Sequence, residues 1–333
     1  MTGALAVTAA DISRITERLF LTVGDRRRNL TAFWVLLVLA GVIAAAGVVA
    51  DSTATVIGAM IVAPLMTPIL GTALALVLAD RRQLVTNIAL VVGAAIAVVL
   101  IGFVIGLMVQ VDVVAATNSQ VSGRVSPRLI DLLAAVATGM VGAFALVRPD
   151  VSDTLPGVAI AISLVPPLAV VGLTLESGAA GEAASALLLF GTNVAAIIAT
   201  GTVLMLAAGV RHVAAEAEIT DVRVGRLRGR SLVAVAASLV LVAVPLAAGS
   251  VRVLQEQRLV SQAEPIATSW AAAKGWQVSD VFLRGSSLHV VVIGVPPAPE
   301  GSELRSAFDA EGLADVDVEL TIVVGGSETL DGA

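Results

Sequence analysis

Seven long stretches of the sequence contain no charged residue, and this feature constrains the fold more than any other. A helix needs about 20 apolar residues to cross ~30 Å of hydrocarbon, and each stretch meets or approaches that length. Because lipid offers the backbone no hydrogen-bonding partner, the stretches must form helices. Only 14% of the 333 residues are charged and 57% are hydrophobic, so a soluble fold is excluded. The stretches are Phe33–Ala50, Thr53–Ala79, Leu84–Val111, Leu132–Val147, Leu155–Leu175, Ala183–Val210 and Leu232–Gly249.

Arginines are distributed unevenly between the connecting segments, and this predicts the orientation. Thirteen of them fall before the first stretch and after the second, fourth and sixth, whereas the connections on the other side hold only Arg124 and Arg128. Basic connections stay in the cytoplasm. The amino terminus is therefore expected to be cytoplasmic, and seven crossings place the residues after about 250 outside the cytoplasm.

The segments beside the stretches have their own patterns. In residues 1–29, Thr8 and Asp11 mark a helix start, and Ile12, Ile15 and Leu19 recur at helical spacing, so a short amphipathic helix is expected on the membrane surface. A frayed tail is the alternative. A second basic segment before the last stretch is expected to meet anionic lipid headgroups and, lacking an aromatic platform, not nucleic acid. Its residues are Arg223, Arg226, Arg228 and Arg230.

The carboxy-terminal residues read as a small folded domain. Val251–Ala273 and Ser302–Ala310 are expected to be helices, and Trp276–Leu283, Leu288–Val295 and Val316–Val324 to be strands. The predicted order α-β-β-α-β makes residues 251–325 an extracytoplasmic α+β domain, followed by a loose tail, 326–333. In element order alone, this domain resembles the BON domain, a small bacterial envelope module.

An internal repeat relates the first three stretches to the next three. Asp51 precedes Pro64 by 13 residues, and Asp153 precedes Pro166 by the same 13. With the orientation above, residues 33–111 and 129–210 form a 3+3 inverted repeat, and 232–249 is an extra helix. Inverted repeats with interrupted helices are typical of secondary transporters.

Prolines within the second and fifth stretches point to the candidate site. Each proline removes an N–H donor and clashes with the preceding turn, so breaks are expected at Pro64 and Pro68 and at Pro166 and Pro167. Broken ends are tolerated at depth only if they are buried or line a wet cavity. A packing kink is the alternative. The candidate binding residues are Gly58, Met60, Pro64, Thr67, Pro68, Ser163, Pro166, Pro167, Thr192 and Asn193, while Asp51, Ser52, Asp153 and Thr154 are expected to cap helices or form a gate.

Two long motifs carry a family resemblance. Val56–Ile69 reads VIGAMIVAPLMTPI, and Arg148–Gly172 reads RPDVSDTLPGVAIAISLVPPLAVVG. Both resemble the signature of domain of unknown function 389, a family of uncharacterised prokaryotic membrane proteins, over roughly residues 30–210. The resemblance implies a prokaryotic inner or plasma membrane and a core of several spans. It implies no substrate and no catalytic residues.

The remaining composition narrows the function. The stretches hold no ionisable residue, which argues against a carboxylate proton relay. With no Cys, two His and no nucleotide or hydrolase motif, we expect no metal, no cofactor and no enzyme activity. The sequence favours a secondary transporter or channel-like permease for a small ion or polar solute. The alternative is a membrane scaffold or envelope sensor whose outer domain binds a partner or ligand. Glycine pairs such as Gly102 and Gly106 indicate close helix packing, including that of a homo-oligomer.

Overall fold

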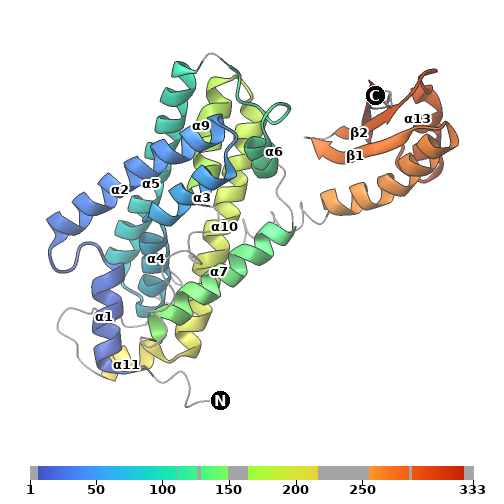
Figure 1. The fold of residues 1–333 in the computed structure, drawn as a ribbon. Coiled ribbons are helices and arrows are strands. Elements are labelled where there is room, and N and C mark those ends of the chain that lie inside the picture. Colours follow the sequence, from blue (N-terminus) through green and yellow to red (C-terminus); the bar gives the residue numbers. More distant parts are fainter. Residues whose placement is uncertain are drawn as a thin grey trace, which may run out of the picture. The chain divides into compact units, whose positions relative to one another are not determined.

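The computed structural model describes residues 7–109, 111–125, 129–148, 164–216, 255–284 and 287–325 (Figure 1). The chain divides into two units, Met1–Ser250 (unit 1) and Val251–Ala333 (unit 2). Three predictions fall outside the described residues: the extra helix 232–249, the tail 326–333 and the basic cluster of Arg223, Arg226, Arg228 and Arg230.

Four long helices dominate unit 1. They are α2 (Arg26–Val49), α5 (Arg81–Met108), α7 (Leu129–Val147) and α10 (Ala180–Ala207). The carboxylates of Asp25 and Asp80 accept backbone N–H bonds at the starts of α2 and α5, which fixes where both helices begin. Among the described residues, four helices are long and apolar enough to cross a membrane, or five with a bent pair counted as one span. The number seven stays a prediction.

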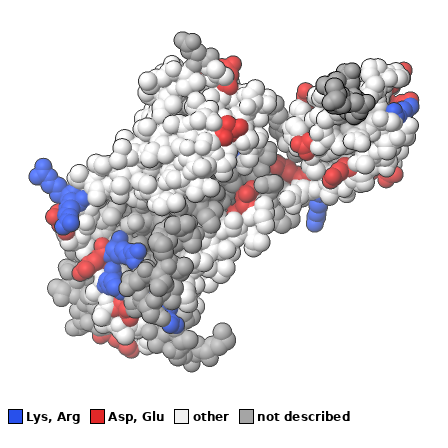
Figure 2. Space-filling view, viewed as in Figure 1, with Lys and Arg blue, Asp and Glu red and all other residues white. Residues whose placement is uncertain are grey.

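The surface of these helices is apolar. On the face shown in Figure 2, most of the described surface of unit 1 carries no charge, and its charged side chains gather in a few places. On α5, Ile96, Leu100 and Val104 are each more than half exposed. Water does not favour such a long exposed apolar stripe, whereas the hydrocarbon of a bilayer does. Unit 1 is therefore built as a helical membrane protein.

Three shorter helices complete the bundle: α3 (Thr53–Val62), α4 (Met66–Leu78) and α9 (Val165–Glu176). Every residue of α4 from Pro68 to Leu78 is buried, as is every residue of α9 from Val165 to Thr174. A helix that is apolar on all sides belongs in a core. Accordingly, α4 packs on α5 and α10, and α9 packs on α2, α5 and α10.

The hairpins α4–α5 and α9–α10 turn in the same way. Ala79 (φ 55°) follows α4 and Gly178 (φ 74°) follows α9, both in the left-handed region. The next N–H, from Asp80 or Ala179, reaches back to a carbonyl of the helix just ended, at 2.9 Å and 2.8 Å respectively. This backward bond satisfies carbonyls that the helix end leaves free.

Helices α5 and α9 lie side by side and run in the same direction. A Cβ atom on Gly102 would meet the carbonyl oxygen of Ala169 at 2.6 Å, and one on Gly106 would meet the Glu176 carboxylate at 2.9 Å, farther along both helices. Both hairpins reverse the chain. It follows that α4 runs antiparallel to α9, and α5 antiparallel to α10.

The amino-terminal helix α1 (Ala9–Leu19) begins with the predicted cap, since the side chains and N–H groups of Thr8 and Asp11 bond reciprocally. Its apolar residues Ile12, Ile15 and Leu19 are at most 3% exposed. They pack on α4, α7 and the short helix α11 (Val210–Glu216). The apolar face of α1 thus contacts protein, not the membrane surface as predicted.

Unit 2 has a three-stranded mixed sheet. In chain order, the elements of unit 2 are a helix over residues 255–273, β1 (Gln277–Arg284), β2 (Ser287–Gly294), α13 (Gly301–Ala310) and β3 (Asp317–Val324). β2 lies in the middle, antiparallel to β1 and parallel to β3. Ala267, Trp276, Val290 and Phe308 from these elements share one buried cluster. The predicted order α-β-β-α-β is what the structure has.

Candidate functional site at a broken helix

The second apolar stretch is broken at Pro64. α3 ends at Val62, α4 begins at Met66, and their axes differ by 47°. Pro64 cannot donate to the carbonyl of Met60, and it forces Ala63 into an extended conformation (φ −67°, ψ 126°). The predicted break at this proline is confirmed. Pro68 does not break the chain, because it lies in the first turn of α4, where its missing N–H is not needed.

The break leaves backbone groups without helical partners. Across it, the N–H of Ala63 donates to Ala59 at 3.1 Å, that of Thr67 to Pro64 at 3.3 Å, and that of Ile69 to Leu65 at 3.4 Å. Among the described residues, no such bond reaches the carbonyls of residues 60–63, at the end of α3 and directly after it. The candidate residues Gly58, Met60, Pro64 and Thr67 are only half-buried here. The break therefore offers hydrogen-bond acceptors on a partly open surface.

The corresponding part of the fifth stretch is described only from Leu164 onward. α9 starts at Val165, with Pro166 and Pro167 in its first turn. The break expected at these prolines stays a prediction, since the residues before Leu164 lie outside the described part. Both prolines are buried. Three further candidates, Asp153, Thr154 and Ser163, lie outside the described residues.

Five threonine hydroxyls in α4, α9 and α10 are satisfied locally. Each donates to a carbonyl four residues earlier in its own helix, as Thr192 does to Leu188 at 3.0 Å. The same holds for Thr72, Thr174, Thr200 and Thr202. Asn193 is buried within α10, and Asn87 is buried in α5 with its Nδ2 donating to Gln83 at 2.8 Å. Such bonds make polar side chains tolerable in an apolar interior.

The turn between α2 and α3 is pinned by α6 (Ser119–Val125). Ser52 caps α3, as predicted, by accepting from the N–H of Thr55. Asp51 instead serves α6: its carboxylate accepts from the Ser119 hydroxyl at 2.7 Å and the Gln120 N–H at 3.1 Å. The Ser119 bond is the main reason that the pKa of Asp51 is lowered.

Sequence reasoning missed a polar residue that joins these elements. Asn118 is buried, donates from Nδ2 to the carbonyl of Val48 at 2.7 Å, and accepts from the N–H of Val121 at 3.1 Å. Its position directly before Ser119 is the usual signal of a helix cap. Burial lowers the pKa of the neighbouring Arg124, which donates to the carbonyl of Gln120.

Two arginines at the opposite end of the bundle were also missed. Arg14 of α1 donates to the carbonyl of Leu146 at the end of α7, at 3.0 Å, and Arg211 of α11 donates to Val77 at the end of α4, at 2.8 Å. Cations at carboxy-terminal helix ends complement the helix dipole. No group of His, Asp and Glu in the described part of the chain could hold a metal ion.

Long apolar helices and one bent helix pair define the class of the chain, a helical membrane protein. Residues 60–199 match the family model described as Domain of unknown function (DUF389), which confirms the resemblance carried by the two motifs. An uncharacterized protein, MJ0678, of Methanocaldococcus jannaschii is 30% identical over 196 residues. The aligned segment covers 59% of this chain and 60% of that protein. No solved structure matches.

Proposed function

We propose that unit 1 is a secondary transporter or channel-like permease for a small ion or polar solute, with its binding place where α3 ends and where α4 and α9 begin. The observation that carries the proposal is the pair of short helices, α4 with 13 residues and α9 with 12, both encased by protein and both with proline in the first turn. Each spans about 20 Å, less than the ~30 Å of hydrocarbon, so their first turns lie at membrane depth.

A repeated spacing of the helices supports this proposal and favours an inverted repeat. The first residues of α4 and α9 are 99 positions apart, and so are those of α5 and α10. The left-handed residues Ala79 and Gly178 keep the same spacing. At this spacing Pro68 corresponds to Pro167, whereas the sequence motifs had paired Pro64 with Pro166.

Contacts between the two halves also follow this spacing: one contact becomes another when each residue is replaced by the residue 99 positions away. Gly102 of α5 lies against Ala169 of α9, and Gly201 of α10 lies against Leu70 of α4. Moving Gly102 and Leu70 forward by 99 positions gives Gly201 and Ala169. Two contacts that interchange in this way are expected from a two-fold relation between the halves.

The directions of the helices favour an inverted relation between the halves. Equivalent helices, α4 with α9 and α5 with α10, run antiparallel, as derived above from the α5–α9 contacts. With the arginine distribution, this favours a cytoplasmic amino terminus and an extracytoplasmic unit 2. Interrupted helices that meet at the interface of inverted repeats are where secondary transporters bind substrate.

A flux screen tests the proposal. The full chain is placed in proteoliposomes, and uptake of small cations, anions and neutral polar solutes is compared for wild type, Pro64→Ala and Leu133→Ala. Leu133 is 61% exposed on α7 and serves as the control. We expect flux of one solute class that falls at least tenfold in Pro64→Ala only. Absence of flux for every solute, or equal loss in both variants, would contradict the proposal.

A scaffold or sensor remains the second candidate because of the edge strand of unit 2. Ile322, Val323 and Val324 of β3 are 36–61% exposed. An apolar edge strand pairs readily with another chain. Since the chain has no cysteine, Thr321→Cys reports such pairing directly. Disulfide-linked dimers of the full chain in membranes would favour a scaffold or sensor. Absence of such dimers would count against it.

A further inference from the structure

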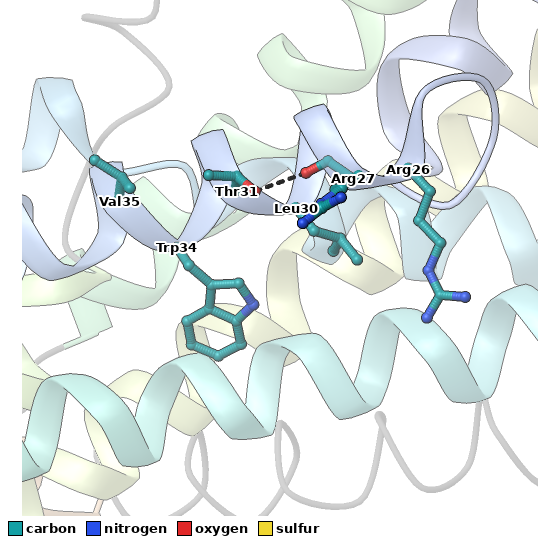
Figure 3. Close-up of a pocket in the computed structure, with 6 residues that line it drawn as sticks. All are labelled: Arg26, Arg27, Leu30, Thr31, Trp34 and Val35. Atoms are coloured by element: carbon teal, nitrogen blue, oxygen red, sulfur yellow. Dashed lines mark hydrogen bonds between the residues drawn. The ribbon is translucent and has the colours of Figure 1, made fainter.

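A groove at the start of α2 combines two arginines with an apolar floor. Arg26, Arg27, Leu30, Thr31, Trp34 and Val35 line it, and its volume is about 650 Å³ (Figure 3). These residues fall on one side of the first three turns of α2. The Thr31 hydroxyl donates to the carbonyl of Arg27 at 2.8 Å, so it is already occupied. The groove thus presents cations and apolar surface, with little other polarity.

The two arginines are available to an anion. Both are exposed, and no described residue forms an ion pair with either. The neighbouring Asp25 carboxylate accepts from the N–H of Arg28 at 3.1 Å in its capping role. Phosphate binds paired arginines through charge-assisted hydrogen bonds.

Trp34 marks the level at which the groove turns apolar. Its indole reaches toward α5, and a Cβ on Gly93 would lie 3.5 Å from the ring (Figure 3). Trp34 lies eight residues after Arg26, or about 12 Å along the helix. Tryptophan favours the boundary between headgroups and hydrocarbon. Arg26 and Arg27 are then at headgroup height.

Beyond Trp34 the surface is continuously apolar. On α5, Val92 and Ile96 are 52% and 56% exposed, and on α2, Val35 and Val38 are 52% and 44% exposed. The two helices run side by side here in the same direction, since Trp34 meets Gly93 and Gly41 meets Ile101. The order of cations, tryptophan and apolar side chains matches the order of phosphate, glycerol and acyl chain in a lipid.

We propose that this groove binds one anionic phospholipid of the adjacent leaflet, with its phosphate at Arg26 and Arg27 and an acyl chain along Trp34 and α5. Basic grooves between membrane helices suit anionic headgroups. The proposal depends on the membrane location of unit 1 and not on transport, so a failed flux screen leaves it standing.

Native mass spectrometry of the delipidated full chain provides the test. Phosphatidylglycerol or phosphatidylcholine is added to wild type, to Arg26→Gln/Arg27→Gln, and to Arg82→Gln/Arg258→Gln, a control with the same change in charge. We expect one bound phosphatidylglycerol in wild type and control, and about tenfold weaker binding in the groove variant. Equal binding of the two lipids, or equal binding by the two variants, would overturn the proposal.

Fluorescence separates a lipid from its alternatives. Trp34 lies in unit 1, whereas Trp270 and Trp276 lie in unit 2, so phosphatidylglycerol with brominated acyl chains is expected to quench Trp34 at low mole fraction, with Trp34→Phe as background. Displacement of the lipid by free glycerol phosphate would mean a headgroup site only. Loss of quenching in a dimer would mean that a second copy covers the groove. Either result contradicts the proposal. Both measurements use the wild-type arginines, so they do not depend on whether the arginine variant folds.

Discussion

A single methyl group at Gly172 tests how closely α5 and α9 pack. A Cβ at this position would lie 2.2 Å from the carbonyl oxygen of Val99 and 2.6 Å from the backbone nitrogen of Phe103. Both are backbone atoms, so no rotamer change relieves the overlap. Ordinary contact begins near 3.4 Å. Gly172→Ala must therefore push the helices apart by about 1 Å, with loss of contacts along their length.

The expected cost follows from two opposing terms. Overpacking costs about 1–3 kcal/mol, whereas alanine in place of glycine inside a helix contributes about 1 kcal/mol. Gly191 of α10 is the matched control, because no atom lies within 4 Å of its Cβ position. Gly191→Ala should therefore gain about 1 kcal/mol of stability from the higher helix propensity of alanine, with no overpacking cost. The two variants should differ in stability by about 2 kcal/mol.

Thermal unfolding in a mild detergent measures this difference. If 1 kcal/mol corresponds to about 2–4 °C for a unit of this size, Gly172→Ala should unfold roughly 4–8 °C below Gly191→Ala. Equal unfolding temperatures would refute direct backbone contact between α5 and α9. The antiparallel directions of α4 and α9, which were derived from that contact, would then lose their basis.

Three further perturbations test the cap of α7, the α2–α3 turn and the orientation of the chain. Arg14→Ala removes a donor at 3.0 Å from the end of α7 and should cost about 1 kcal/mol in the same assay, whereas an unchanged unfolding temperature would show that the contact is idle. Since the Ser119 bond lowers the pKa of Asp51 below 3.8, its stabilising contribution is present above that pH and is lost as the pH falls through the folded pKa. Hydrogen exchange of residues 111–125 should accelerate below pH 3.8 in wild type beyond the intrinsic rate, and Asp51→Asn should remove that pH dependence. Ser122→Cys and Glu311→Cys should both react with an impermeant maleimide outside intact cells, and labelling only after lysis would contradict the predicted orientation.

Local chemistry allowed some features to be predicted from the sequence. Pro64 breaks the second stretch because a missing N–H acts on its own helix, whatever surrounds it. Thr8 and Asp11 cap α1 for the same local reason. The alternation of apolar residues in the strands gave the element order of unit 2.

Other features depended on neighbours that the sequence does not name. Asp51 caps α6 rather than α3 because the chain returns to it 68 residues later, at Ser119. The apolar face of α1 was assigned to lipid, since lipid and protein interiors favour the same side chains.

By itself, the sequence determined membrane residence, the break in the second stretch and the family resemblance, because a charge-free stretch and a proline act through local solvation and local sterics. Only the tertiary structure decided that α4 and α9 are the buried centre of unit 1 and that they run antiparallel. An apolar helix reads alike whether it faces lipid or protein, and its direction relative to a distant helix is set by contacts such as Gly102 with Ala169.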